Sequence, residues 1–133
     1  MATRVFLGLS ALLWLPYGLY CFFQPGALVD LAGVVSTSPT GATELRATYG
    51  GLTAALGTLA LVGALSSAWT RHSLVTLGTA CAGFGSARLA GAALDGGVGA
   101  YTVQALLLEF GTLACVVYFL RRPVVVASGA RHA

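Results

Sequence analysis

The sequence predicts an all-α fold, a four-transmembrane-helix bundle forming a single integral membrane domain over residues 1–133, and three observations lead to it. Charged residues make up 8% of the 133 residues and apolar residues 57%, so a soluble core of this size would lack a polar coat. Four apolar stretches are each long enough for a helix to cross a bilayer. The chain contains arginine but no lysine, and most of its arginines lie at the ends of these stretches.

The first two spans are expected at 5–23 and 47–69. The first follows Arg4 and ends at Gln24-Pro25-Gly26 rather than at a small-residue cleavage site, which indicates a retained helix and not a signal peptide. The second carries no charge and can cross with some tilt.

The linker between these spans carries two further expectations. Its middle, residues 27–35, is apolar with a single acid and too short to cross, which predicts a short helix in the outer membrane interface. Thr43 is expected to cap the second helix, because threonine is a favoured N-cap residue.

The third and fourth spans are expected at 73–94 and 101–120, followed by a tail at 121–133. If the third span stopped before Arg88, it would be too short to cross roughly 30 Å of hydrocarbon at about 1.5 Å per residue. Arg88 therefore lies inside it, as Glu109 lies inside the fourth. Asp95-Gly96-Gly97 between them has the chemistry of a turn.

Charges in the connecting segments predict the orientation. Alternating spans place one group of residues on one side: Arg4, Arg71, Arg121, Arg122 and Arg131. They place the acids on the other side: Asp30, Glu44 and Asp95. By the positive-inside rule both ends of the chain are then cytoplasmic, as in a multi-pass protein of a bacterial inner (cytoplasmic) membrane.

A polar layer is expected in the outer half of the bundle. Arg88 and Glu109 reach a similar depth from opposite directions, and a charge near the bilayer centre costs about 2.5–3.5 kcal/mol on insertion scales. Arg46 and Tyr49, three residues apart, are expected on the same face of the second helix. Gln104 adds polar groups above Glu109. Three explanations of this layer remain open: an ion pair that fixes helix packing, a binding site, or an Arg88 side chain that extends to the outer interface.

The remaining chemistry-bearing residues exclude several classes of site. Cys21, Cys81 and Cys115 are isolated and form no CxxC motif, which argues against thiol redox chemistry. His72 and His132 share no spacing with carboxylates, so neither a metal nor another cofactor is expected. The scattered arginines do not form a nucleic-acid-binding surface.

The ordered set Glu44-Leu-Arg-Ala-Thr-Tyr-Gly-Gly51, Gly83-Phe-Gly-Ser-Ala-Arg88, Asp95-Gly96 and Glu109 resembles an uncharacterised family of small bacterial four-helix membrane proteins. That family is catalogued as a domain of unknown function, and its general layout is similar to that of DoxX-like proteins. The resemblance implies the fold and a shared polar set, with no activity: Arg46, Tyr49, Gly50, Gly51, Arg88, Asp95 and Glu109.

Two main functional hypotheses follow. In the first, a binding protein or accessory subunit holds a lipophilic molecule with a polar or anionic head in a pocket formed by Arg46, Tyr49, Arg88 and Glu109. The further binding residues are Gly50, Gly51, Gln104 and Asp95. In the second, Glu109 is the general acid, beside Arg88, of an intramembrane isomerase or cyclase acting on an isoprenoid-like substrate. A third reading is a structural partner of another membrane protein. The lipid bilayer is the expected surrounding in all three.

Overall fold

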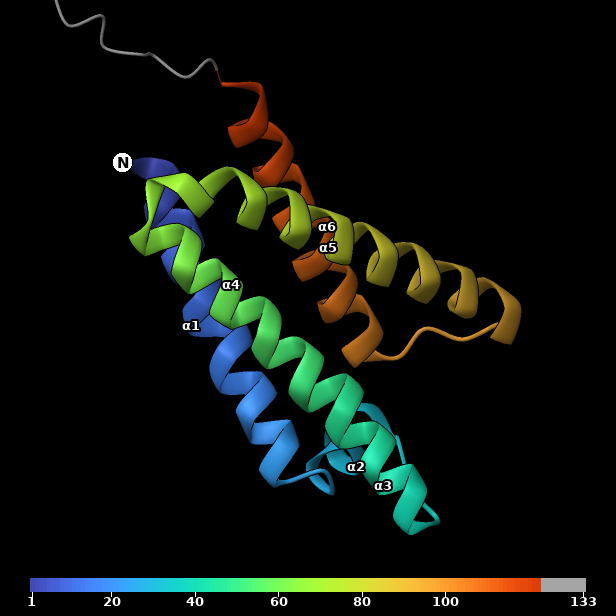
Figure 1. Ribbon diagram of the computed structural model, residues 1–133. Coiled ribbons are helices and arrows are strands. Elements are labelled where there is room, and N and C mark those ends of the chain that lie inside the picture. Colours follow the sequence, from blue (N-terminus) through green and yellow to red (C-terminus); the bar gives the residue numbers. More distant parts are fainter. Residues whose placement is uncertain (123–133) are drawn as a thin grey trace, which may run out of the picture.

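The structure, a computed structural model, describes residues 1–122, which form helices and contain no strand. The elements in order are α1 (Ala2–Phe23), α2 (Ala27–Ala32), α3 (Pro39–Leu45), the π-helical segment η1 (Arg46–Leu52), α4 (Thr53–Leu65), α5 (Ser67–Asp95) and α6 (Ala100–Arg121) (Figure 1). The all-α prediction is confirmed for this part of the chain. The predicted tail lies outside the described residues from 123 onward.

The long helices form two pairs, α1 with α4 and α5 with α6, and α4 also contacts α5 (Figure 1). Glycines allow α1 and α4 to approach closely. A Cβ atom at Gly57 would overlap the backbone of Leu15, and one at Gly18 would overlap the backbone of Ala54. Only glycine fits at such crossings, where two backbones come into contact.

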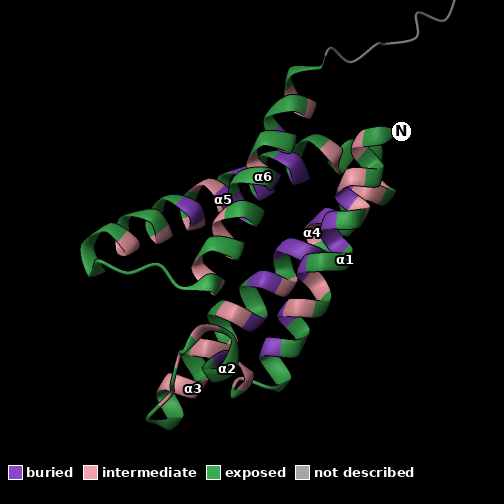
Figure 2. Ribbon diagram, turned by 180° about the vertical axis from the view of Figure 1, so that it is seen from behind, coloured by how far each residue is buried: buried purple, intermediate pink, exposed green. Residues whose placement is uncertain are grey.

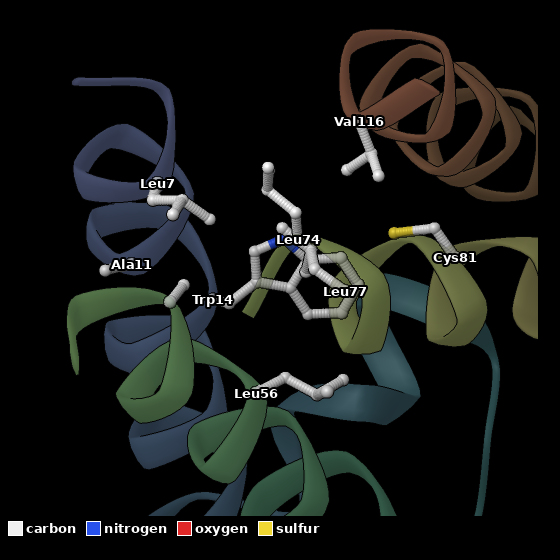
Figure 3. Packing of buried hydrophobic residues seen from close by; sticks show 9 residues of the cluster. Leu7, Ala11, Trp14, Leu56, Leu74, Leu77, Cys81 and Val116 are labelled. Carbon is white, nitrogen blue, oxygen red and sulfur yellow. The ribbon is translucent and has the colours of Figure 1, made fainter. Parts of the chain in front are cut away.

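The hydrophobic core lies toward the end where α1 begins and α6 ends, which we call the packed end. Its buried side chains come from α1, α4, α5 and α6 (Figure 3): Leu7, Ala11, Trp14, Leu56, Ala60, Leu74, Leu77, Cys81 and Val116. At the same end the Arg4 guanidinium donates hydrogen bonds to the carbonyl oxygens of Ala64 (2.6 Å) and Leu65 (2.7 Å). Because the last carbonyls of a helix lack intrahelical partners, Arg4 caps α4.

At the opposite end, which we call the open end, the two helix pairs separate. The second half of α5 projects away from α1 and α4 (Figure 1), and most of its residues are exposed (Figure 2). A Cβ atom at Gly83 or Gly91 would meet no atom within 4 Å. Gly83 and Gly91 therefore pack against no other described helix, whereas Gly85, between them, lies against the Phe110 ring of α6.

Three helical stretches are long and apolar enough to cross a membrane: Ala2–Phe23, Pro39–Leu65 and Ala100–Arg121. The protein is thus a membrane protein by the length and composition of its helices. The expected third span, 73–94, lies within the continuous helix α5, but α5 is not among these three. The fourth crossing, by α5, therefore remains a prediction from the sequence.

The second long helix is displaced toward the N-terminus relative to the expected span at 47–69. It begins at Pro39, because the Ser38 hydroxyl accepts a hydrogen bond from the Gly41 amide (3.0 Å) and Pro39 occupies the first turn. The prediction that Thr43 caps this helix is wrong, since its hydroxyl donates to the Pro39 carbonyl oxygen from inside α3. The helix ends at Leu65, where Ser66 adopts an extended backbone.

The connections agree with the turn chemistry of the sequence. The expected short helix between the first two spans is present as α2, which ends at Gly33 with a φ of 68°. The predicted Asp95-Gly96-Gly97 turn is also present, and Gly96 ends α5 with a φ of 65°. Both glycines adopt the left-handed conformation that ends helices.

Candidate functional site

A cavity of about 410 Å³ lies between the two helix pairs, on the open-end side of the core. Residues of α1, η1, α4, α5 and α6 line it: Leu13, Trp14, Tyr17, Thr48, Tyr49, Thr53, Phe84, Arg88, Tyr101, Gln104, Ala105, Leu108 and Glu109. The separation of the helix pairs thus creates a mostly apolar chamber with a few polar groups in its wall, which is the usual character of a small-molecule site.

Arg88 and Glu109 form an ion pair in the wall of this cavity. Arg88 Nη2 lies 2.9 Å from Glu109 Oε1, and Arg88 Nε lies 3.3 Å from both carboxylate oxygens. The Glu109 side chain is 5% exposed and the Arg88 side chain 25%. Because the carboxylate accepts along its whole edge, the guanidinium neutralises it in a geometry suited to two planar groups.

Tyr101 connects this ion pair to the first helix. Its ring centroid lies 5.7 Å from the Arg88 guanidinium carbon, within the range of a cation–π contact. Its hydroxyl lies 3.0 Å from the Tyr17 hydroxyl, so one of the two donates to the other. A continuous set of polar contacts therefore joins α1, α5 and α6 across the cavity.

The π-helical turn places two further residues at the cavity. Thr48 and Tyr49 of η1 line it, as does Thr53 at the start of α4, whose hydroxyl lies 3.5 Å from the Thr48 carbonyl oxygen five residues earlier. π-helical turns are rare and often occur at functional sites. In this protein the π-helical turn is η1, whose residues Thr48 and Tyr49 line the cavity.

Arg46 does not reach the cavity, contrary to the sequence prediction. Its Nε donates to the Phe22 carbonyl oxygen of α1 (3.2 Å), whereas Tyr49 lines the cavity. The prediction assumed α-helical spacing, in which residues three apart share a face. Because η1 is wound as a π-helix, with more residues per turn, the two side chains diverge.

The structure brings together four of the expected site residues, Arg88, Glu109, Tyr49 and Gln104. The other expected residues lie elsewhere. Gly50 is buried against Phe22, where a Cβ atom would overlap α1, and Gly51 is exposed beside it. Asp95 is exposed at the end of α5, away from the cavity lining.

Apart from Tyr49, the aromatic residues in the cavity wall were not identified from the sequence as site residues. Trp14 and Tyr17 lie on α1, and the Trp14 ring stacks on Phe84 of α5 with centroids 6.4 Å apart. The Trp14 indole Nε1 is buried with no hydrogen-bond acceptor among the described residues. The three-residue spacing of Trp14 and Tyr17, which places them on one face of α1, was the available signal.

The cavity lining carries one positive and one negative charge, and these neutralise each other. Within residues 1–122 no group of three or more His, Cys, Asp or Glu side chains could hold a metal ion. The site can therefore offer hydrogen bonds, an ion pair and aromatic faces to a bound molecule.

Comparisons with known proteins give a family and no activity. Residues 2–120 match the family model described as "Domain of unknown function (DUF4345)". This match confirms the resemblance to an uncharacterised family. No curated protein matches the chain, and no solved structure does.

Proposed function

Because the chain belongs to the DUF4345 family, whose description assigns no activity, we propose a function from the cavity itself. In this proposal the protein binds a lipophilic molecule with a polar head inside the membrane, as a binding protein or as an accessory subunit of a membrane complex. The body of the ligand lies against the apolar wall, and its head lies beside Arg88, Glu109, Tyr49 and Gln104.

The observation that carries this proposal is the cavity between the helix pairs. Its volume of about 410 Å³ lies within the range of roughly 300–1,000 Å³ that is typical of small-molecule sites. Leu13, Phe84 and Leu108 supply apolar wall. An ion pair that served only to join α5 and α6 would not require α1 and η1 to line a chamber beside it.

The course of the chain supports four membrane crossings. α6 runs antiparallel to α1, because Phe119 packs on Phe6 (ring centroids 5.3 Å apart) while Tyr101 contacts Tyr17. α4 returns to the packed end, where Arg4 caps it. The 29 residues of α5 must then carry the chain back toward the open end.

The length of α5 suits a tilted crossing. At about 1.5 Å per residue it extends about 43 Å, enough to cross roughly 30 Å of hydrocarbon with a steep tilt. The ion pair with Glu109 offsets the charge of Arg88 within this span. α5 is less apolar than the other spans because it carries Arg88 as well as Arg71 and His72 near its start.

The distribution of charge supports an orientation with the packed end in the cytoplasm. Arg4 lies at this end, as do Arg71 near the start of α5 and Arg121 and Arg122 at the end of α6. By the positive-inside rule the open end then faces outward. In the bacterial cytoplasmic membrane that we propose as the location, the cavity lies in the outer half of the bilayer.

The cavity is open on one side, which gives a lipophilic ligand a route from the bilayer. Its lining residues Leu13, Thr48, Gln104 and Leu108 are exposed. These residues come from three helical segments, α1, η1 and α6. A molecule dissolved in the outer leaflet could therefore enter sideways, without crossing water.

The geometry gives less support to an enzyme that uses Glu109 as a general acid. Both carboxylate oxygens accept hydrogen bonds from Arg88, and an ionised carboxylate is an acceptor only. A general acid must instead donate a proton to its substrate. We therefore assign Glu109 the role of holding Arg88 in place.

The test is the set of lipophilic molecules that co-purify with the protein in mild detergent, measured by mass spectrometry after extraction. Ala105 lines the cavity, and Ala105→Phe places a ring in it. We expect the variant to lose a molecule that accompanies the wild type by about tenfold, which corresponds to about 1.4 kcal/mol in binding.

Gly111→Phe is the matched control, because it adds the same ring to the same helix at a position where a Cβ atom meets nothing within 4 Å. We expect this variant to retain the molecule. Equal co-purification with all three proteins, or no molecule enriched over bulk lipid with the wild type, would show that the cavity is not a binding site.

A further inference from the structure

Resting on the proposed binding function, we infer that the ligand is an uncharged lipophile whose head carries a carbonyl oxygen, which accepts hydrogen bonds from Arg88 and Gln104. Three properties of the cavity carry this inference: its charge balance, the donor atoms left over by the ion pair, and the scarcity of free acceptors.

The charge balance disfavours a ligand with a net charge. Arg88 and Glu109 are the acid–base pair of the lining, and their charges cancel at 2.9 Å. A carboxylate or an ammonium group entering this chamber would bring a charge with no partner of its own. Unpaired charges removed from water are costly, so an uncharged head is favoured.

The ion pair leaves hydrogen-bond donors on Arg88 unused. A guanidinium has five N–H donors, and the three bonds to Glu109 involve only Nε and Nη2. Nη1 takes part in none of them. Because Arg88 lines the cavity and is a quarter exposed, these remaining N–H groups are available to a ligand.

Other groups in the wall add to the supply of donors. Whichever tyrosine hydroxyl donates in the Tyr17–Tyr101 bond, the hydrogen of the accepting hydroxyl is not used in that bond. Gln104 contributes an amide with two N–H donors beside its one carbonyl acceptor.

Free acceptors are fewer: Gln104 Oε1 and the hydroxyl oxygens of Thr48 and Tyr49 belong to groups that also donate, whereas Arg88 only donates. Both oxygens of Glu109 already accept from Arg88, and the Thr48 carbonyl oxygen faces the hydroxyl of Thr53. An alcohol would bring another donor hydrogen to a site that already has an excess of them. A carbonyl oxygen brings two lone pairs and no hydrogen, so it matches the unpaired donors best.

The test uses competition for one reporter inside the cavity. The chain has two tryptophans, so a Trp69→Phe protein in lipid nanodiscs retains only Trp14, which lines the cavity. Laurdan, a lipophilic naphthyl ketone, is bound while energy transfer from Trp14 is recorded. Displacement is then measured with a methyl ketone, a secondary alcohol, a carboxylate and a primary amine of equal chain length.

We expect the ketone to displace laurdan at about fivefold lower concentration than the alcohol, because one matched hydrogen bond contributes about 0.5–1.5 kcal/mol. The carboxylate and the amine should be weaker than the ketone by about tenfold or more. Each concentration is corrected for partition into protein-free nanodiscs, so that the comparison reports binding to the protein.

The variant Gln104→Leu removes one donor group without disturbing the ion pair. It should reduce the preference for the ketone over the alcohol to about twofold or less. Gln24→Leu is the matched control, because it makes the same change at the end of α1, outside the cavity lining. It should leave the fivefold preference unchanged.

The outcomes separate this inference from the proposed function. Displacement by all four compounds with the alcohol, the acid or the amine preferred would overturn the carbonyl assignment and leave a lipid-binding cavity in place. Laurdan transfer that none of the compounds reduces, and that Ala105→Phe does not reduce either, would overturn both.

Discussion

The packed end and the open end of this bundle are built from the same four long helices, but one end contains a packed core and the other contains a cavity. At the packed end, side chains from all four helices meet around Leu74, Leu77 and Val116 with almost no exposed surface. At the open end the two helix pairs separate from each other, and a chamber lined by aromatic and polar residues takes the place of a core. The packed end fixes the fold, and the open end is free to hold a ligand.

The type of contact also differs between the two ends. The packed end is stabilised by close packing of small residues and aliphatic side chains. Across the open end, α1, α5 and α6 are joined by the Tyr17–Tyr101 hydrogen bond and the Arg88–Glu109 ion pair. Polar contacts are directional, so they can hold helices apart at a set distance where apolar packing would collapse them.

The largest effect is expected from leaving Glu109 without its partner. Arg88→Met removes the guanidinium from a nearly buried carboxylate and should lower the free energy of unfolding by about 3–5 kcal/mol. The measurement is denaturation in mixed detergent micelles. The double variant Arg88→Met/Glu109→Gln removes both charges, and we expect it to recover more than half of the loss.

That recovery separates a coupled pair from two independent residues. If the double variant is as unstable as the sum of the two single variants, the ion pair does not join α5 to α6.

A second comparison uses leucine truncation at the two ends. Leu77 is 2% exposed in the core, so Leu77→Ala should cost roughly 2–5 kcal/mol through the space it leaves. Leu108 is 41% exposed and borders the cavity, so Leu108→Ala should cost less than about 1 kcal/mol. Equal losses in the same denaturation assay would contradict the distinction between a packed and an open end.

The smallest of the three effects tests glycines at the two ends. A Cβ atom at Gly63 would overlap the Ser73 side chain, so Gly63→Ala should cost about 1–3 kcal/mol by overpacking. At Gly83 the same change meets open space and should stabilise α5 by about 0.5–1 kcal/mol, because alanine is the better helix former. A neutral Gly63→Ala would mean that α4 and α5 are less tightly packed than the structure shows.

The sequence contained enough information to bring Arg88 and Glu109 together. Span lengths forced Arg88 into a helix, and antiparallel order brought Glu109 to a similar depth. The position of Arg46 could not be predicted in the same way, because the argument assumed α-helical spacing and η1 is a π-helix. No local pattern in Arg46–Leu52 distinguishes the two kinds of turn.

The aromatic residues Trp14 and Tyr17 of the cavity lining could not be predicted from the sequence for a different reason. In a soluble protein the buried face of a helix differs in polarity from the exposed face. In α1 both faces are apolar, since lipid and core have similar chemistry, so Trp14 and Tyr17 could not be assigned to the cavity. The divergence of α5 from α4 was equally hidden, because a crossing angle depends on packing and leaves no periodic signal.

The ion pair also has a consequence for how the protein is made. Synthesis proceeds from the N-terminus, and Glu109 is added 21 residues after Arg88. If α5 crosses the bilayer as we propose, it carries during that interval an uncompensated cation that opposes its entry into lipid by about 2.5–3.5 kcal/mol. We therefore expect α5 to wait for α6 and to insert with it as one hairpin, so that the neutralising contact forms during biogenesis and not after it.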